Sequence, residues 1–216
     1  MKSFLIIGMG RFGQYLCREL AKLGNEILIV DEDEERLTPC LPLATSAKIG
    51  DCTKPEVLKE LGIGNFDASF VCIGTNFQSS LEITSLLKEM GSKWVISRAS
   101  TDVQAKFLLR NGADEVVYPE RDIAERAAKK ASANHVFDFV DLAGDYGIYE
   151  IPPMKTWIGK SIKEVNVRAD YHISILGIKK DEATVMMPGA DYRFQEQDHL
   201  LVLGQDEVMN KFLKKL

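Results

Sequence analysis

Short apolar runs alternate with amphipathic stretches through the first 120 residues of the chain. The runs predict strands over residues 3–7, 26–30, 47–49, 68–73, 93–97 and 115–118. Apolar positions at helical spacing predict helices over residues 12–23, 54–61, 77–90 and 101–111. Because the strands are apolar at consecutive positions, we expect helices to cover both faces of their sheet. The pattern therefore predicts an α/β fold, a doubly wound parallel Rossmann sheet.

The pattern changes after Pro119. A helical stretch is predicted from Asp122 to Val140, alanine-rich and charged at first and apolar towards its end, before a break at Ala143-Gly144-Asp145. Strands are predicted over residues 147–151, 172–179, 184–187 and 199–203, and a closing helix over 205–216. We therefore expect a Rossmann nucleotide-binding domain over residues 1–121, a connecting segment over 122–143 and a small α+β C-terminal domain over 144–216.

Composition narrows the class of protein. The 216 residues are 45% hydrophobic and carry a net charge of −5, which argues against nucleic acid as a partner. No apolar run approaches the roughly 18 residues that a transmembrane helix needs. The apolar start of the chain meets Gly8 and Arg11, so it predicts a first strand and not a signal peptide. The four cysteines form no C-x-x-C pair, and reduced thiols are expected.

The first predicted strand is followed by the glycine loop Gly8-Met9-Gly10-Arg11-Phe12-Gly13. The loop follows a strand, opens a helix and precedes a strand that ends in an acidic residue, which is the context of a dinucleotide-binding loop. Its glycines permit the tight turn, the approach of a pyrophosphate and close packing of the helix on the sheet. Phosphates would lie at the helix N-terminus, where free N–H groups and the helix dipole favour anions. All six residues are predicted to form a nucleotide site.

Charged residues near this loop extend the predicted site. Asp31 ends the second strand and is expected to accept hydrogen bonds from ribose hydroxyl groups, with Glu32 beside it as a further candidate. An acidic residue at this position disfavours the 2′-phosphate of NADP. Arg11 is either a solvent-exposed residue at the helix start or a positive charge for terminal phosphates. Arg36 is either an exposed residue or a second cation near the ribose or phosphates.

The ends of the later strands supply more candidates, because ligands of open parallel sheets bind there. Asp51 either contacts the nucleotide or caps the next turn, and Cys52 is predicted to be a small neighbour of the base. Glu120 either holds a divalent cation together with nucleotide phosphates or stabilises the start of a helix. Arg98 is expected near the base or at an interface. The remaining candidates are Thr53, Ile73, Gly74, Thr75, Asn76 and Ala99.

Residues that would carry catalysis are missing from the predicted site. The histidines His135, His172 and His199 lie outside the strand-end loops of the Rossmann half and are expected to be structural. The chain has no G-x-S-x-G, H-E-x-x-H or Walker motif. We therefore expect a nucleotide-binding protein that is not an enzyme. An NAD-dependent oxidoreductase on the same fold is the alternative from another class, and an NAD-sensing transcriptional regulator would need a basic face for DNA.

Taken together, these motifs resemble the RCK family, the regulatory subunits of bacterial potassium uptake channels. The resemblance covers essentially the whole chain, and one Rossmann half with one C-terminal half is similar to the single-repeat KtrA and KtrC type, not the tandem TrkA type. In the Rossmann half it is carried by the residues Gly8-Met9-Gly10-Arg11-Phe12-Gly13, Asp31, Gly50-Asp51-Cys52-Thr53, Gly74-Thr75-Asn76, Ser97-Arg98-Ala99 and Pro119-Glu120-Arg121-Asp122. In the C-terminal half it is carried by Ile158-Gly159-Lys160-Ser161-Ile162, Arg168, Ile173 and Asp198-His199-Leu200-Leu201-Val202-Leu203-Gly204.

The resemblance implies a regulatory role in potassium transport. Homodimers would assemble into a cytoplasmic ring of eight subunits on the inner face of a membrane potassium translocation subunit. Exchange of ATP and ADP in the Rossmann cleft would change the ring's shape and gate the channel, and NAD(H) can also bind. Arg11 matches the family arginine that reaches a γ-phosphate across the dimer. Glu120 matches the acid that helps hold a divalent cation, Mg²⁺ or Ca²⁺, and residues 122–140 match the crossover helix and hinge.

The resemblance also implies a candidate second ligand. Some family members bind cyclic di-AMP between paired C-terminal domains, and Arg168, Ile173 and Pro188 fall where that site would be. The segment around them departs from the family pattern. Ser174 stands where asparagine is usual among the cyclic di-AMP binders, and His172 stands where glycine is common.

Overall fold

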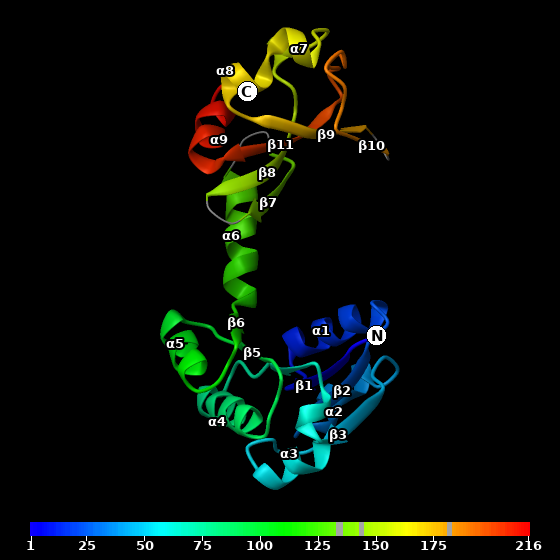
Figure 1. Ribbon diagram of the computed structural model, residues 1–216, viewed down its shortest axis with the longest axis vertical. Coiled ribbons are helices and arrows are strands. Elements are labelled where there is room, and N and C mark those ends of the chain that lie inside the picture. Colours follow the sequence, from blue (N-terminus) through cyan, green and yellow to red (C-terminus); the bar gives the residue numbers. More distant parts are fainter. Residues whose placement is uncertain (133–135, 143–144, 181–182) are drawn as a thin grey trace. The chain divides into compact units, whose positions relative to one another are not determined.

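Two separate sheets organise the chain. The computed structural model describes residues 1–132, 136–142, 145–180 and 183–216 (Figure 1). These residues group into two units, Met1–Arg121 and Asp122–Leu216. Among the described residues, no helix combines the length and the apolar character needed to cross a membrane.

The first unit is built on a parallel sheet. Within its residues the six strands follow the order β3-β2-β1-β4-β5-β6, which is the order of the doubly wound Rossmann fold. The strands are β1 (Ser3–Ile7), β2 (Glu26–Asp31), β3 (Ser46–Ile49), β4 (Ala68–Val71), β5 (Val95–Arg98) and β6 (Glu115–Val117). The sequence prediction of the fold is therefore confirmed, with strand ends that differ by no more than two residues.

Helices cover both faces of this sheet because its strands are apolar on both faces. Leu5 and Ile7 of β1 pack in one buried cluster with residues of α3 and α4, and Ile6 between them packs in another with Cys17 of α1. Figure 1 shows α1 on one side of the sheet and α3 and α4 on the other. The helices are α1 (Arg11–Lys22), α2 (Glu34–Leu37), α3 (Pro55–Leu61), α4 (Phe77–Glu89) and α5 (Asp102–Arg110), with 3₁₀ turns at Thr38–Cys40 and Ile63–Asn65.

The second unit carries an antiparallel sheet. Among its described residues the order is β10-β9-β11-β8-β7. The strands are β7 (Asp138–Leu142), β8 (Tyr146–Ile151), β9 (Ser174–Lys180), β10 (Ala183–Met186) and β11 (His199–Gln205). The helices are α6 (Pro119–Ser132), which begins in the first unit, α7 (Ile162–Val165), α8 (Val167–Tyr171) and α9 (Asp206–Leu213), with a 3₁₀ turn at Lys155–Trp157.

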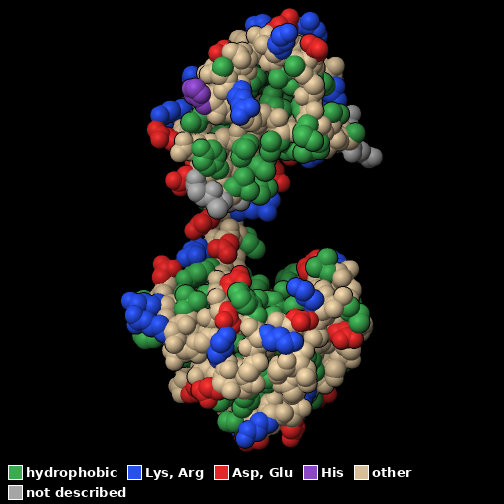
Figure 2. Space-filling model, viewed as in Figure 1, with side chains coloured by type: hydrophobic (Ala, Val, Ile, Leu, Met, Phe, Trp, Pro, Cys, Tyr) green, Lys and Arg blue, Asp and Glu red, His purple; other side chains and the backbone are tan. Residues whose placement is uncertain are grey.

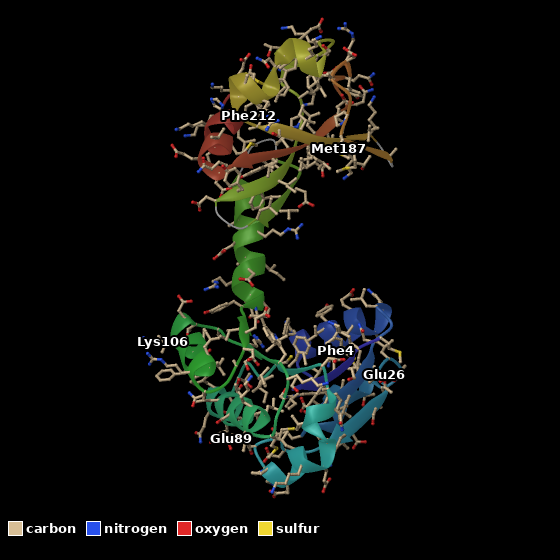
Figure 3. All side chains as sticks on the ribbon, viewed as in Figure 1. Phe4, Glu26, Glu89, Lys106, Met187 and Phe212 are labelled. Carbon is tan, nitrogen blue, oxygen red and sulfur yellow. The ribbon has the colours of Figure 1, made fainter. Side chains whose placement is uncertain are left out.

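Aromatic rings form the core of the second unit. The Trp157 ring is 2% exposed, and its centroid lies 5.3 Å from that of Phe194 and 5.6 Å from that of Phe212 on α9, which is labelled in Figure 3. Tyr171 of α8 packs edge-on against Trp157 at 5.1 Å. Offset and edge-on ring pairs of this kind add packing energy beyond the apolar area they bury. This cluster joins α8 and α9 to the sheet.

One predicted element is wrong. The helical stretch expected to reach Val140 ends at Ser132, and Asp138–Leu142 forms strand β7. Phe139 is 2% exposed and Val140 is 49% exposed, so apolar residues here alternate between two faces as in a strand. The predicted break at Ala143-Gly144 and the histidine His135 lie outside the described residues.

The sequence prediction also lacked the short helices α7 and α8, and it placed the start of strand β9 too early. Ser161 caps α7 by accepting from the Glu164 N–H, and the Glu164 carboxylate accepts from the Ser161 N–H, which is a capping box. His172, predicted as a strand residue, ends α8 with a φ of +56°, so β9 starts at Ser174. The S-x-x-E spacing was available in the sequence as the signal for α7.

Apolar side chains also reach the surface of both units, as Figure 2 shows. In the second unit they include Val140, Leu142 and Tyr146, which are 41–49% exposed. Edge strand β10 exposes Val185 and Met186, and Met187 after it is labelled in Figure 3. Exposed apolar residues on a sheet edge are typical of surfaces that contact other chains.

Candidate functional site

A cleft of about 380 Å³ opens at the carboxyl ends of the parallel strands of the first unit. This is the place where open α/β sheets bind ligands, and the volume is within the usual range for small-molecule sites. Most of the predicted site residues line it. They are Gly8, Gly10, Arg11, Phe12, Asp31, Glu32, Arg36, Asp51, Cys52, Thr53, Ile73, Gly74, Thr75, Asn76, Arg98 and Glu120.

The remaining three predicted residues support the cleft from behind. Met9 is fully buried, and its backbone N–H donates to Asp31. Gly13 packs on the Gly8 carbonyl, where a β-carbon would collide with the backbone. Ala99 is 2% exposed in a small core with α5. These three residues shape the loop and the sheet edge and do not line the cleft.

The glycine loop delivers a free helix N-terminus into the cleft. Gly8 has a φ of +93°, which favours glycine, and Gly10 precedes α1 with no atom within 4 Å of where its β-carbon would be. No side chain caps α1, and its first turn has no acidic residue. The first N–H groups of an α-helix have no partner inside the helix. The loop can therefore donate several backbone hydrogen bonds to an anion.

Asp31 is fixed at the edge of the cleft by the loop itself. Its side chain is buried, and its Oδ2 accepts from the Met9 N–H at 2.6 Å while its Oδ1 accepts from the Asp33 N–H at 3.0 Å. Arg36 lies beside it, with its Nε 3.2 Å from Asp33 Oδ2. A carboxylate has about four acceptor positions, so two remain for a ligand. Asp31 thus presents a fixed hydrogen-bond acceptor next to the anion site.

The third and fourth strand ends present short polar turns. Asp51 Oδ1 accepts from the Thr53 N–H at 3.0 Å and from its hydroxyl at 2.6 Å. These hydrogen bonds, with Lys54 nearby, hold the pKa of Asp51 below its usual value of 3.8. Asn76 caps α4 by accepting from the Ser79 N–H at 3.2 Å. Asp51 therefore closes its turn and also lines the cleft.

The two cysteines that line the cleft have unreactive thiols. Cys52 and Cys72 are each 3% exposed, and burial raises the pKa of both thiols to about 12. A thiol with such a pKa stays neutral near pH 7 and is a poor nucleophile. The four cysteines of the chain are free and buried.

An ion pair connects Arg98, the last residue of β5, to Glu120, which follows β6. Arg98 Nη2 donates to Glu120 Oε1, and Glu120 lies in the first turn of α6. The Arg98 side chain is 19% exposed and that of Glu120 is 66% exposed. Arg121, the next residue of α6, stacks on Tyr118 at 3.5 Å and bonds Asp102. The start of α6 is therefore attached to the first unit by two arginines.

Arg11 differs from the other arginines of the cleft. Arg36 is paired with Asp33 and Arg98 with Glu120, whereas the exposed Arg11 makes no ion pair within the part of the chain that the structure describes. Arg11 is the first residue of α1, directly at the anion site. A cation without a partner there has its full charge available for a ligand.

Five residues of the cleft were missed by sequence reasoning as binding residues: Ile7, Gly50, Cys72, Ser79 and Ile83. Gly50 stands beside Asp51, and Cys72 directly precedes the predicted Ile73, so adjacency was an available signal. Ser79 and Ile83 lie one and two turns into α4. Only the tertiary packing of α4 brings them to the cleft.

The candidate second-ligand residues of the C-terminal unit do not share one environment. Arg168 is exposed on α8 and Pro188 is half-buried after β10, whereas Ile173 is 1% exposed inside the aromatic core. The Ile173 side chain is therefore committed to packing and is not available at the surface.

Comparison with known proteins assigns the family. Residues 4–119 match the TrkA-N domain model, and residues 147–216 match the TrkA-C domain model. The Ktr system potassium uptake protein C of Bacillus subtilis (strain 168) is 36% identical over 215 residues, which is 100% of this chain and 97% of that protein. The chain belongs to the RCK family. The resemblance found in its motifs is thereby confirmed.

Other relatives and solved structures agree with this assignment. The Ktr system potassium uptake protein A of Vibrio alginolyticus is 31% identical over 100% of this chain and 98% of that protein. The structure of the GsuK RCK domain matches with a TM-score of 0.66 at 18% identity, over 99% of this chain and 47% of that chain. The GsuK channel bound to NAD matches with a TM-score of 0.64 at 19% identity, over 96% of this chain and 38% of that chain. At these identities the solved structures show a shared fold.

Proposed function

We propose that this chain is a regulatory subunit of a potassium transport system that binds ATP and ADP in the cleft of its first unit and catalyses no reaction. The observation that carries the proposal is the open glycine loop, beside which Arg11 forms no ion pair with the residues that the structure describes. It is supported by full-length relatives named as Ktr potassium uptake proteins. Structures of the related GsuK fold carry NAD in one case and ADP in another, so NAD(H) is a second candidate ligand.

The phosphates and the ribose of the nucleotide would each meet a suitable group in the cleft. The N–H groups at the start of α1 would bind the phosphates, and the fixed Asp31 carboxylate would accept from the ribose hydroxyls. Arg11 would contact the terminal phosphate, from the same subunit or across a dimer. Because the γ-phosphate adds charge beyond that of ADP, a cation at this place distinguishes the two nucleotides.

A divalent cation fits the charges of the cleft. Its lining has three arginines and four acidic residues, which leaves one excess negative charge in a site proposed for a polyphosphate. Among the described residues, no three His, Cys, Asp or Glu side chains gather as a metal site. Glu120 would therefore supply one carboxylate and the phosphates the other oxygens, a ligand set suited to Mg²⁺ or Ca²⁺. The cation would neutralise phosphate charge.

The regulatory part of the proposal concerns assembly. Homodimers would form a ring, octameric in the proposed form, on the cytoplasmic face of a membrane potassium translocation subunit, with α6 as crossover helix and hinge. A nucleotide changes such a ring only if it binds the two ring states with different affinities. Cyclic di-AMP would be a ligand of the C-terminal unit through Arg168 and Pro188, with the buried Ile173 acting through packing.

The first experiment measures nucleotide binding with and without Arg11. Calorimetric titration of Arg11→Ala is expected to show ATP affinity reduced by about tenfold or more and ADP affinity reduced less, since a charge-assisted hydrogen bond to the γ-phosphate is lost. Arg18→Ala is the matched control, because Arg18 lies on the same helix but packs over Tyr15, outside the cleft lining. An unchanged ratio of ATP to ADP affinity in Arg11→Ala would contradict the role of Arg11.

The second experiment separates regulation from catalysis and tests assembly. Wild-type protein stabilised by ATP and ADP in thermal unfolding supports the proposal. Stabilisation by NADH alone, with substrate turnover, would support the oxidoreductase alternative. The solution mass is expected to be that of an oligomer with either nucleotide, and a monomer under both conditions would contradict the ring.

A further inference from the structure

Arg98 is the cation of the cleft that is paired with Glu120, the candidate ligand of a divalent cation. It is the last residue of β5, and its guanidinium bonds the Glu120 carboxylate in the first turn of α6. Its side chain is mostly buried, whereas Glu120 is mostly exposed to the cleft. The pair therefore consists of a fixed cation and a carboxylate that a ligand can reach.

Packing keeps the Arg98 guanidinium in place. A β-carbon at Gly74 would lie 2.6 Å from Arg98 Cζ, so the guanidinium packs directly over the Gly74 backbone. Arg98 Nε is buried and has no hydrogen-bond partner among the described residues. Since its Nε is left without a hydrogen bond there, the ion pair with Glu120 is the polar contact that the described residues give to this guanidinium.

The same carboxylate is the one that a nucleotide-bound divalent cation would use. A guanidinium and a divalent ion on one carboxylate repel each other at short range, and the low exposure of Arg98 weakens the screening of that repulsion. Neither Arg11 nor Arg36 pairs with Glu120. Arg98 is thus the positive group of the cleft that opposes a metal ion at this position.

We propose that Arg98 competes with the divalent cation for Glu120 and so sets the cation concentration at which nucleotide phosphates are bound. This inference rests on the proposed function, because it takes the ligand to be a nucleotide with a cation on its phosphates. When the cation binds, the bond between Arg98 and Glu120 is given up, and the first turn of α6 loses that attachment to the first unit.

The test is the Mg²⁺ dependence of ATP binding to the full chain. Arg98→Gln is expected to lower the half-saturating Mg²⁺ concentration by about twofold to fivefold, the size expected for the loss of a partly exposed ion pair. Arg98→Lys keeps the competing charge and is expected to stay near wild type. Arg110→Gln, at the exposed end of α5 and outside the cleft lining, is the matched control and is expected to change nothing.

A second pair of variants identifies the group for which the two cations compete. Glu120→Gln is expected to remove the Mg²⁺ dependence, and adding Arg98→Gln to it is expected to have no further effect, since the shared carboxylate is gone. Thermal unfolding of each variant without nucleotide verifies that it is folded.

Three results would overturn the inference or its basis. A half-saturating Mg²⁺ concentration that is unchanged or raised in Arg98→Gln overturns the competition, and a raised value assigns Arg98 to positioning Glu120 for the cation. Wild-type binding of ATP that ignores Mg²⁺ overturns the competition while leaving nucleotide binding intact. Wild-type protein that binds neither ATP nor ADP overturns the proposed function itself, and the competition with it.

Discussion

The two units use charged side chains in opposite ways. In the second unit they are satisfied inside the protein: Asp198 is fully buried and accepts from the Tyr192 hydroxyl at 2.9 Å and the Gln195 N–H at 2.8 Å. Glu150 is likewise buried beside His199 at 2.7 Å and Lys179 at 3.4 Å. Buried charges of this kind are stable only when fully partnered, and they specify packing.

In the first unit several charged groups instead line the cleft at one edge of the sheet. Arg11 has no ion pair among the described residues, and the N-terminus of α1 has no capping side chain. The difference shows that charged residues can either stabilise the fold or bind a ligand. Complete pairing makes a charge structural, and incomplete pairing next to a cavity makes it available to a ligand.

The variant with the largest expected effect disrupts the core of the second unit and leaves the cleft of the first unit intact. Trp157→Ala removes the ring that joins Phe194, Tyr171 and Phe212, and should destabilise the second unit by about 3–5 kcal/mol. Calorimetry should show its transition lowered while ATP affinity at the first unit is retained. Trp94→Ala is the control, because Trp94 is 47% exposed in the first unit. Loss of ATP binding in folded Trp157→Ala protein would contradict the conclusion that the first unit binds the ligand and that the core of the second unit is only structural.

A smaller effect separates the shape of the glycine loop from its binding surface. Gly13→Ala places a β-carbon against the Gly8 carbonyl, so it should destabilise the first unit by about 1–3 kcal/mol. Gly10→Ala meets no atom within 4 Å, so it should fold nearly as wild type yet bind ATP more weakly, since the methyl group occupies the path of the pyrophosphate. Urea unfolding and titration measure the two effects. Equal losses of stability in the two variants would be evidence against this division.

The smallest expected effect concerns pH. The hydrogen bonds from Thr53 lower the pKa of Asp51 in the folded state below 3.8. Its ionised form therefore adds stability that is fully present above the unfolded value and is lost as the pH falls through the lower folded value. Asp51→Asn should be slightly less stable than wild type at about pH 6, and the difference should shrink towards about pH 3. Urea midpoints across that range measure it, and a difference that grows on acidification would show that Asp51 does not stabilise the fold as a carboxylate.

Much of the first unit was predictable from the sequence because its signals are local. Consecutive apolar residues between glycines indicate strands covered on both faces, and the spacing of Gly8, Gly10 and Gly13 fixes the start of α1. Asp31 was placed correctly at the cleft, because the end of a strand determines where its last residue lies. The burial of its carboxylate against the Met9 N–H was not predictable, since it depends on how the loop folds back.

The sequence was less informative where the direction of a side chain and its tertiary packing decide whether it is buried or lines the cleft. Met9 and Ala99 belong to strand-end segments, but position in a motif does not say whether a side chain faces the cleft or the core. The apolar run Val136–Leu142 contains too few residues for its alternation to outweigh the helical pattern before it. Ile173 was named as a ligand residue, and its burial follows from contacts with α9 and β11 that are far away in the sequence.

Glu120 connects the cleft to a long helix, because it belongs both to the cleft lining and to the first turn of α6. Its 14 residues make a rod about 21 Å long, and its root stands in the wall of the cleft. A rotation of about ten degrees at the first turn would displace the far end by about 4 Å. Any change in direction that a broken ion pair at Glu120 allowed would therefore be larger at the last turn of α6 than at its first.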